Sequence, residues 1–395
     1  MESEARKSRI EFPKLSSTKP NSTNWQNIFV ANIKDHVRFH AKLCKLPIIT
    51  PFLWDNEREL LRVNKFAWKV KKSLVLSIHL CIVIAMLSEI VAFVLVSKNA
   101  DKFAALLRIV FFCLISCPFL YHQHAWSDSE GLCTLLNCIA QFNQLKTGNL
   151  DTLWIRTILT VMQMSMFLAT CLVTVLMAFC PDFPPFPSSL LVYVPQGWLV
   201  IIIRMVVTTI QVWNVISWMC HAGLILCCAL LCNGAMYIGV HSLTKYPYPS
   251  NQSLKKYRQL LLLGTYINLQ FRKSIQLALL MAVIALGILC FSATIKCHAE
   301  VSFMVLGIII LITVNAVVAS SLMAAIPGKV NGMSKELLND WKPKSVKGRL
   351  DKKTVRSLRE IKLQFGTANY FERNTCLAVM DFQIEKTVDL LLLFK

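Results

Sequence analysis

Uninterrupted apolar runs of about 20 residues recur along this 395-residue chain and alternate with polar, basic segments. A run of that length is what a helix needs to cross the hydrocarbon core of a bilayer. The pattern predicts an all-α membrane protein with seven transmembrane helices. The expected spans are residues 73–96, 103–121, 154–179, 210–240, 275–295, 303–325 and 375–394.

The apolar stretch 190–240 is too long for one span, so it holds either two spans or one span preceded by an interfacial piece. Basic residues decide between these: fifteen precede Ser73, six lie in 241–274 and twelve in 326–373, while the other connections hold few. Cytoplasmic loops carry such an excess of Lys and Arg. One span at 210–240, after an outer interfacial helix at 190–207, keeps all three segments in the cytosol. The N-terminus is then cytosolic and Lys395 extracellular.

This topology divides the chain into four parts. Residues 1–72 form a cytosolic arm with an amphipathic helix over 55–72, residues 73–325 hold six spans, residues 326–372 are a basic cytosolic segment, and 373–395 hold the final span. Val355, Leu358 and Ile361 lie near helical spacing and predict a helix over 342–365. Such a helix either joins subunits as an anchor or lies on the inner leaflet, drawn by anionic lipid.

Composition excludes further classes of protein. With 55% hydrophobic and 16% charged residues, the chain is excluded from the soluble globular class. The net charge of +20 lies in blocks between apolar runs, which argues against nucleic-acid binding. No signal peptide precedes the first span, which is therefore expected to direct insertion itself.

Most of the fifteen cysteines lie inside apolar runs and act there as small hydrophobic residues. Cys180 and Cys297 each follow the outer end of a predicted span, where conditions are oxidising, and are a candidate disulfide. His122 and His124 stand without a second Cys/His cluster, so no metal site is expected. No cofactor or catalytic motif is found, and the chain is not expected to be an enzyme.

The final span carries Asp381, Glu385 and Asp389 at i, i+4 and i+8, a face that cannot lie in lipid. This spacing predicts a pore lining that concentrates cations, with Leu390 and Leu393 closing the path by excluding water. In the alternative, residues up to Lys386 stay in the cytosolic layer and only the last few enter the membrane.

The plan as a whole resembles the arthropod gustatory and odorant receptor superfamily. The resemblance covers roughly residues 55–395: seven spans with the amino end inside, the helix LKKYRQLLLLGTYINLQFRKS between spans four and five, and ELLNDWKP and VRSLREIKLQF before a short final helix. In the final helix, gustatory receptors carry Thr-Tyr, an apolar run and Gln-Phe. Here Thr387 matches, while Val388 replaces the Tyr and Phe394 stands at the Gln position.

The resemblance implies a ligand-gated, non-selective cation channel of the plasma membrane, built as a homo- or hetero-tetramer around the final helices. Membrane lipid and a small organic ligand are the expected partners. A secondary transporter or another multipass membrane protein remains the alternative, because Glu89 and Arg108 are charges inside predicted spans. These two side chains either snorkel or pair with each other, or they line a ligand cavity. The residues nominated for a pocket in the outer half of the bundle are Arg108, Thr170, Thr174, Thr208, Gln211, Trp213 and Phe303.

Overall fold

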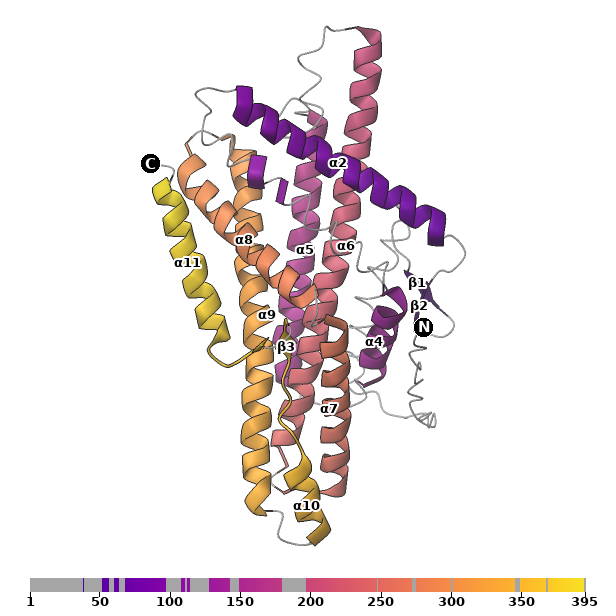
Figure 1. Cartoon of the computed structure of the whole chain (residues 1–395), viewed down its shortest axis with the longest axis vertical. Helices are drawn as coiled ribbons and strands as arrows, with labels where there is room; N and C mark the ends of the chain where they lie inside the picture. Colours follow the sequence, from indigo (N-terminus) through magenta and orange to yellow (C-terminus); the bar gives the residue numbers. More distant parts are fainter. Residues whose placement is uncertain are drawn as a thin grey trace, which may run out of the picture.

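The structure of the chain is a computed structural model, and the fold is drawn in Figure 1. It describes residues 38, 52–56, 60–63, 68–96, 108–110, 112–113, 128–142, 149–179, 197–246, 248–271, 275–299, 301–344, 349–366 and 369–393. The description below concerns these residues alone.

Helices make up nearly all of the described chain, which confirms the all-α expectation. The helices are α2 (Trp68–Val96), α4 (Ser129–Phe142), α5 (Asn149–Phe179), α6 (Trp198–Thr244), α7 (Asn251–Phe271), α8 (Ile275–Cys297), α9 (Phe303–Lys344), α10 (Arg349–Ser357) and α11 (Thr375–Leu393). Two antiparallel pairs of short strands complete the fold: β1 (Phe52–Asp55) with β2 (Leu60–Val63), and β3 (Gln364–Phe365) with β4 (Asn369–Tyr370). Figure 1 shows α5, α6 and α9 running along the long axis, with α11 at one side of the bundle.

Two of the described helices, over residues 276–296 and 303–343, are long and apolar enough to cross a membrane. They overlap the predicted spans 275–295 and 303–325, the first shifted by one residue and the second contained entirely. Helices α2, α5 and α11 closely follow the predicted spans 73–96, 154–179 and 375–394. The span predicted at 103–121 lies mostly outside the described residues, and the count of seven spans stays a prediction.

Helices α6 and α9 are longer than the predicted spans. Helix α6 has 47 residues and α9 has 42, so they extend about 70 Å and 63 Å, twice the thickness of a hydrocarbon core. The predicted break between 190–207 and 210–240 is wrong, because α6 begins at Trp198, after Pro195, and carries the half-buried Arg204 within one continuous helix. Helix α9 likewise continues through Pro327 into the segment predicted as a separate basic region.

The helix predicted over 55–72 is wrong in its first part, where the structure has the β1–β2 hairpin. The hairpin docks on α4 through Leu61, whose N–H donates to Asn137 Oδ1 (2.9 Å) and whose carbonyl accepts from Asn137 Nδ2 (2.9 Å). Burial raises the pKa of Cys133 to about 11, so its thiol keeps its proton and donates to the same carbonyl (2.8 Å). The α4 side chains therefore supply hydrogen-bond partners for the backbone of Leu61 in β2, which is an edge strand.

The buried residues form two clusters. The larger joins the hairpin and α4 to α6, α7, α8 and α9 and includes Tyr257, Trp341 and Phe371. The smaller lies between α2, α5, α6, α8 and α9 and includes Met86 and Ile309. Helix α11 packs along α8 and α9, next to both clusters.

Candidate functional site

Helix α11 attaches to the bundle by one narrow stripe. Its buried residues are Val379, Gln383 and Thr387, spaced i, i+4 and i+8, and they face α8 and α9. Gln383 Nε2 donates to Ser320 Oγ of α9 over 3.2 Å, and both side chains are buried. A Cβ on Gly287 of α8 would lie 3.0 Å from the same Nε2, so α8 also comes close to this amide. These contacts fix how α11 is rotated about its own axis.

That rotation turns the carboxylates away from the bundle. Asp381 and Glu385 each lie two residues from Gln383, which is about 200° around an α-helix. They are exposed on the side of α11 opposite its packed stripe. Asp389 is exposed on a flank of the same open face.

The carboxylates differ in their ion pairs. Lys386 Nζ lies 2.9 Å from Glu385 Oε1 and 2.8 Å from Asp389 Oδ2. No ion pair is found for Asp381 among the described residues. The open face of α11 therefore carries one lone carboxylate near its N-terminal end and, further along, a mixed group of two carboxylates and one ammonium.

Leucines continue this face toward the C-terminus. Leu392 is nine residues past Gln383, about 180° around the helix, and is 55% exposed. Leu390, seven residues past Gln383 and only about 20° away from it, is half-buried against the smaller core cluster. Leu393 is exposed. Of the two leucines nominated from the sequence, Leu393 is thus exposed and Leu390 is packed on its own bundle, whereas Leu392, which was not nominated, is exposed.

Between α10 and α11 the chain runs in extended form across the bundle, and residues 358–366 and 369–374 are called the strap below. The helix predicted over 342–365 is wrong here: α10 ends at Ser357, and Leu358, Ile361 and Leu363 are buried within this chain. Ile361 and Leu363 alternate with the half-buried Lys362, a period of two that suits extended backbone.

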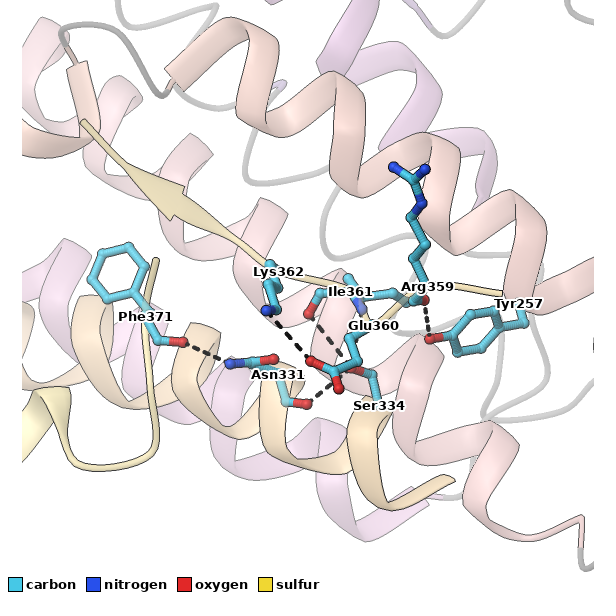
Figure 2. A network of polar contacts seen from close by, with 8 residues as sticks. All are labelled: Tyr257, Asn331, Ser334, Arg359, Glu360, Ile361, Lys362 and Phe371. Carbon is cyan, nitrogen blue, oxygen red and sulfur yellow. Dashed lines mark hydrogen bonds and ion pairs between the residues drawn. The ribbon is translucent and has the colours of Figure 1, made fainter. Parts of the chain in front are cut away.

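Polar side chains of α7 and α9 hold the strap, as Figure 2 shows around Ser334. Tyr257 Oη donates to the Arg359 carbonyl (2.8 Å), and burial raises the pKa of this phenol, so it remains a donor. Asn268 of α7 bonds twice, donating from Nδ2 to the Lys362 carbonyl (2.7 Å) and accepting from the Gln364 N–H (2.9 Å).

The α9 side of the strap leads directly into α11. Ser334 Oγ accepts from the Ile361 N–H (3.1 Å), and Asn331 Nδ2 donates to the Phe371 carbonyl (3.3 Å). Next to them, a Cβ on Gly328 would overlap the Glu372 carbonyl oxygen, so only glycine permits this approach. The strap therefore sets the position from which α11 starts.

A second polar site lies inside the bundle, where Arg108 Nε is 3.1 Å from Glu89 Oε1. Both side chains are buried, and the Arg108 guanidinium is also 3.8 Å from the centre of the Phe93 ring. This geometry supports mutual pairing, one of the two readings of these charges. It does not by itself define a cavity.

The other nominated pocket residues lie in different surroundings. Thr170 and Gln211 are buried, whereas Thr174, Thr208 and Trp213 are half-buried. Phe303 is 91% exposed at the start of α9 and does not join an enclosed group. The pocket stays a prediction. Cys180, the Cys297 side chain, His122 and His124 lie outside the described residues, so the candidate disulfide stays a prediction as well.

The chain is similar in fold to the insect olfactory receptor OR5 from Machilis hrabei, with a TM-score of 0.58 and 11% identity over 92% of this chain and 98% of that chain. The same receptor in complex with eugenol matches with a TM-score of 0.60 and 10% identity over 93% and 98%. No protein-family model and no curated protein matches the sequence. The resemblance to the superfamily is therefore confirmed at the level of the fold.

Proposed function

We propose that the chain is a chemosensory receptor of the plasma membrane, a ligand-gated and non-selective cation channel opened by small organic molecules. The observation that carries the proposal is the orientation of α11, whose carboxylates point away from their own bundle. Support also comes from the fold, because a receptor with this fold has been solved with eugenol.

An acidic helix face that turns away from its own subunit and cannot lie in lipid needs water or a partner. Four copies arranged about an axis, as a homo- or hetero-tetramer, give the open faces of α11 a shared aqueous path. Rings of Asp381 and Glu385, with Asp389 beside them, then concentrate cations in that path. Nothing in this arrangement calls for a cofactor.

The gate in this proposal is Leu392, with Leu393 next to it. Both follow the carboxylates toward the outer end of α11, and Leu392 shares their side of the helix. A ring of leucine side chains closes a narrow path by excluding water. Leu390 is left out, because it packs on its own bundle.

The proposed topology keeps the N-terminus, α7, α10 and the strap in the cytosol, and places Lys395 outside. Its support is the excess of bases before Ser73, in 241–274 and in 326–373. A tag at Met1 should bind antibody only after permeabilisation, and a tag after Lys395 without it. Surface labelling of the Met1 tag would overturn the topology.

Whole-cell recording from cells that express the chain tests the channel. Leu392→Ala should produce a cation current without any added ligand, whereas Leu87→Ala should not, since Leu87 is also an exposed leucine but lies in α2. Asp381→Asn and Glu385→Gln should lower cation conductance at unchanged surface protein, with Glu336→Gln, an exposed carboxylate of α9, as the matched control.

A panel of small organic molecules that includes eugenol should evoke current in the parent. If the three α11 variants behave like the parent, α11 does not line a pore. Saturable uptake of a solute without current would favour the transporter alternative.

A further inference from the structure

Lys386 is the one base in the described part of α11, and it lies beside the carboxylates that face away from the bundle. Its Nζ contacts Glu385 Oε1 at 2.9 Å and Asp389 Oδ2 at 2.8 Å, and the Phe382 ring centre lies 5.9 Å away. The Lys386 side chain is 40% exposed, against 66% for Glu385 and 53% for Asp389. The ammonium is therefore placed between two carboxylates on a surface open to water.

We propose that Lys386 is an internal countercharge that sets how the channel discriminates between monovalent and divalent cations. This inference rests on the proposed function, since it assumes that α11 lines the conducting path. It goes further by assigning a specificity role to one base and by separating the three carboxylates into two functional groups.

The charges along α11 lead to this assignment. Asp381 has no ion pair among the described residues and contributes a full negative charge. Glu385, Lys386 and Asp389 together contribute one further negative charge, because the ammonium offsets one of the two carboxylates. In a tetramer the path then holds an Asp381 ring and a second, partly neutralised belt.

The positive charge of Lys386 affects divalent cations more strongly than monovalent ones. Ca²⁺ needs several oxygen ligands, and carboxylates supply the strongest of them. With Lys386 present, an oxygen of Glu385 and one of Asp389 are already engaged, and a nearby ammonium repels a double charge twice as strongly as a single one. Lys386 therefore keeps Ca²⁺ from binding tightly and blocking the path, while monovalent cations still pass.

Folding does not depend on this ion pair. Exposed pairs contribute little to stability, because water and salt screen them. Lys386→Gln should accordingly reach the cell surface at the parental level. A change in ion selectivity in this variant then reports on the local charge.

The experiment is whole-cell recording in a Leu392→Ala background, which needs no ligand, with CaCl2 added outside in steps. Four chains are compared: the background alone and the background with Lys386→Gln, Lys386→Arg or Lys335→Gln. Lys335 is an exposed base of α9, so its replacement matches the change in net charge away from α11.

The half-blocking Ca²⁺ concentration should fall about tenfold in Lys386→Gln, because one positive charge is removed about 4 Å from the site of a double charge in a partly screened medium. Lys386→Arg keeps the charge and should stay near the background value, as should Lys335→Gln. Equal block in the Gln and Arg variants would overturn the role of Lys386 while leaving the channel proposal standing. Absence of current in all four chains at normal surface protein would overturn the channel proposal, and this inference with it.

Discussion

Gln383 and Ser320 join α11 to α9 through a buried hydrogen bond of 3.2 Å. The bond lies on the side of α11 opposite Asp381 and Glu385, so the contact that holds the helix also points its carboxylates outward. In an apolar environment such a bond is directional, and apolar packing alone would leave the rotation of α11 less well defined.

The first prediction concerns this bond. Ser320→Ala leaves the Gln383 amide buried without its partner in α9, which should cost about 1 to 3 kcal/mol. The midpoint of thermal unfolding in detergent should fall accordingly. Ser321→Ala is the control, because within the described part of the chain the Ser321 hydroxyl bonds to its own helix, at Val317 O over 2.7 Å. Equal midpoints for the two variants would contradict an orienting role for Ser320.

The second prediction concerns the approach of the strap to Gly328. Gly328→Ala places a methyl group against the Glu372 carbonyl, so either α9 or the start of α11 must shift, at a cost of about 1 to 3 kcal/mol. Gly332→Ala, one turn further along α9, meets nothing within 4 Å and should stabilise the helix by about 0.5 to 1 kcal/mol. Thermal unfolding should move in opposite directions for the two variants, and a parallel shift would contradict the close approach.

The sequence predicts those helices whose limits depend on neighbouring residues alone. Apolar runs bounded by charge predict α8 and α11 almost to their ends, because span length and composition are local properties. The separation predicted between 190–207 and 210–240 failed because one helix, α6, runs through both ranges from Trp198 and accommodates Arg204 within it.

Elements with distant partners were missed. The β1–β2 hairpin depends on Asn137, 76 residues away from Leu61 along the chain. The strap depends on Tyr257 and Ser334, which offer partners to a backbone whose apolar positions also suit a helix. In the final helix the three acidic residues are exposed, and their role in a pore stays a prediction. Leu390 was preferred to Leu392, because rotation about the helix axis is set by contacts that spacing alone does not reveal.

The third prediction concerns the hydrogen bonds between Asn268 of α7 and the strap. Asn268→Ala removes both hydrogen bonds of one amide and leaves the Lys362 carbonyl and the Gln364 N–H without this partner. Hydrogen exchange of the backbone amides in 361–364 should become faster, and stability should fall by about 1 to 3 kcal/mol. Thr265→Ala, exposed on α7 and bonded only to Leu261 O, should change neither. Unaltered exchange in Asn268→Ala would show that apolar burial alone holds the strap.

The fourth prediction concerns subunit contacts. Leu358 and Ile361 belong to a segment that was expected either to join subunits or to lie on the inner leaflet, but they are buried in their own chain, so their replacement would destabilise it. Leu262 and Leu269 of α7 are each 62% exposed and seven residues apart on one face, in a helix that the proposed topology keeps out of lipid. Leu262→Asp with Leu269→Asp should reduce the size of the purified particle on a sizing column. Gln259→Asp on the same helix is the control, and an unchanged oligomer in the double variant would exclude this face from the subunit contact.

The last prediction concerns Glu89 and Arg108. Removing one partner of a buried ion pair costs about 3 to 5 kcal/mol, because it leaves the other charge buried without compensation. Glu89→Gln should therefore lower surface protein and the unfolding midpoint. The exchange Glu89→Arg with Arg108→Glu should recover part of both, since it restores opposite charges to the same place. Ser88→Ala, at the neighbouring exposed position, is the control. Should Glu89→Gln instead fold and reach the surface like the parent while altering the response to organic ligands, the pair would be better explained as the polar wall of a ligand cavity, the other reading of these two charges.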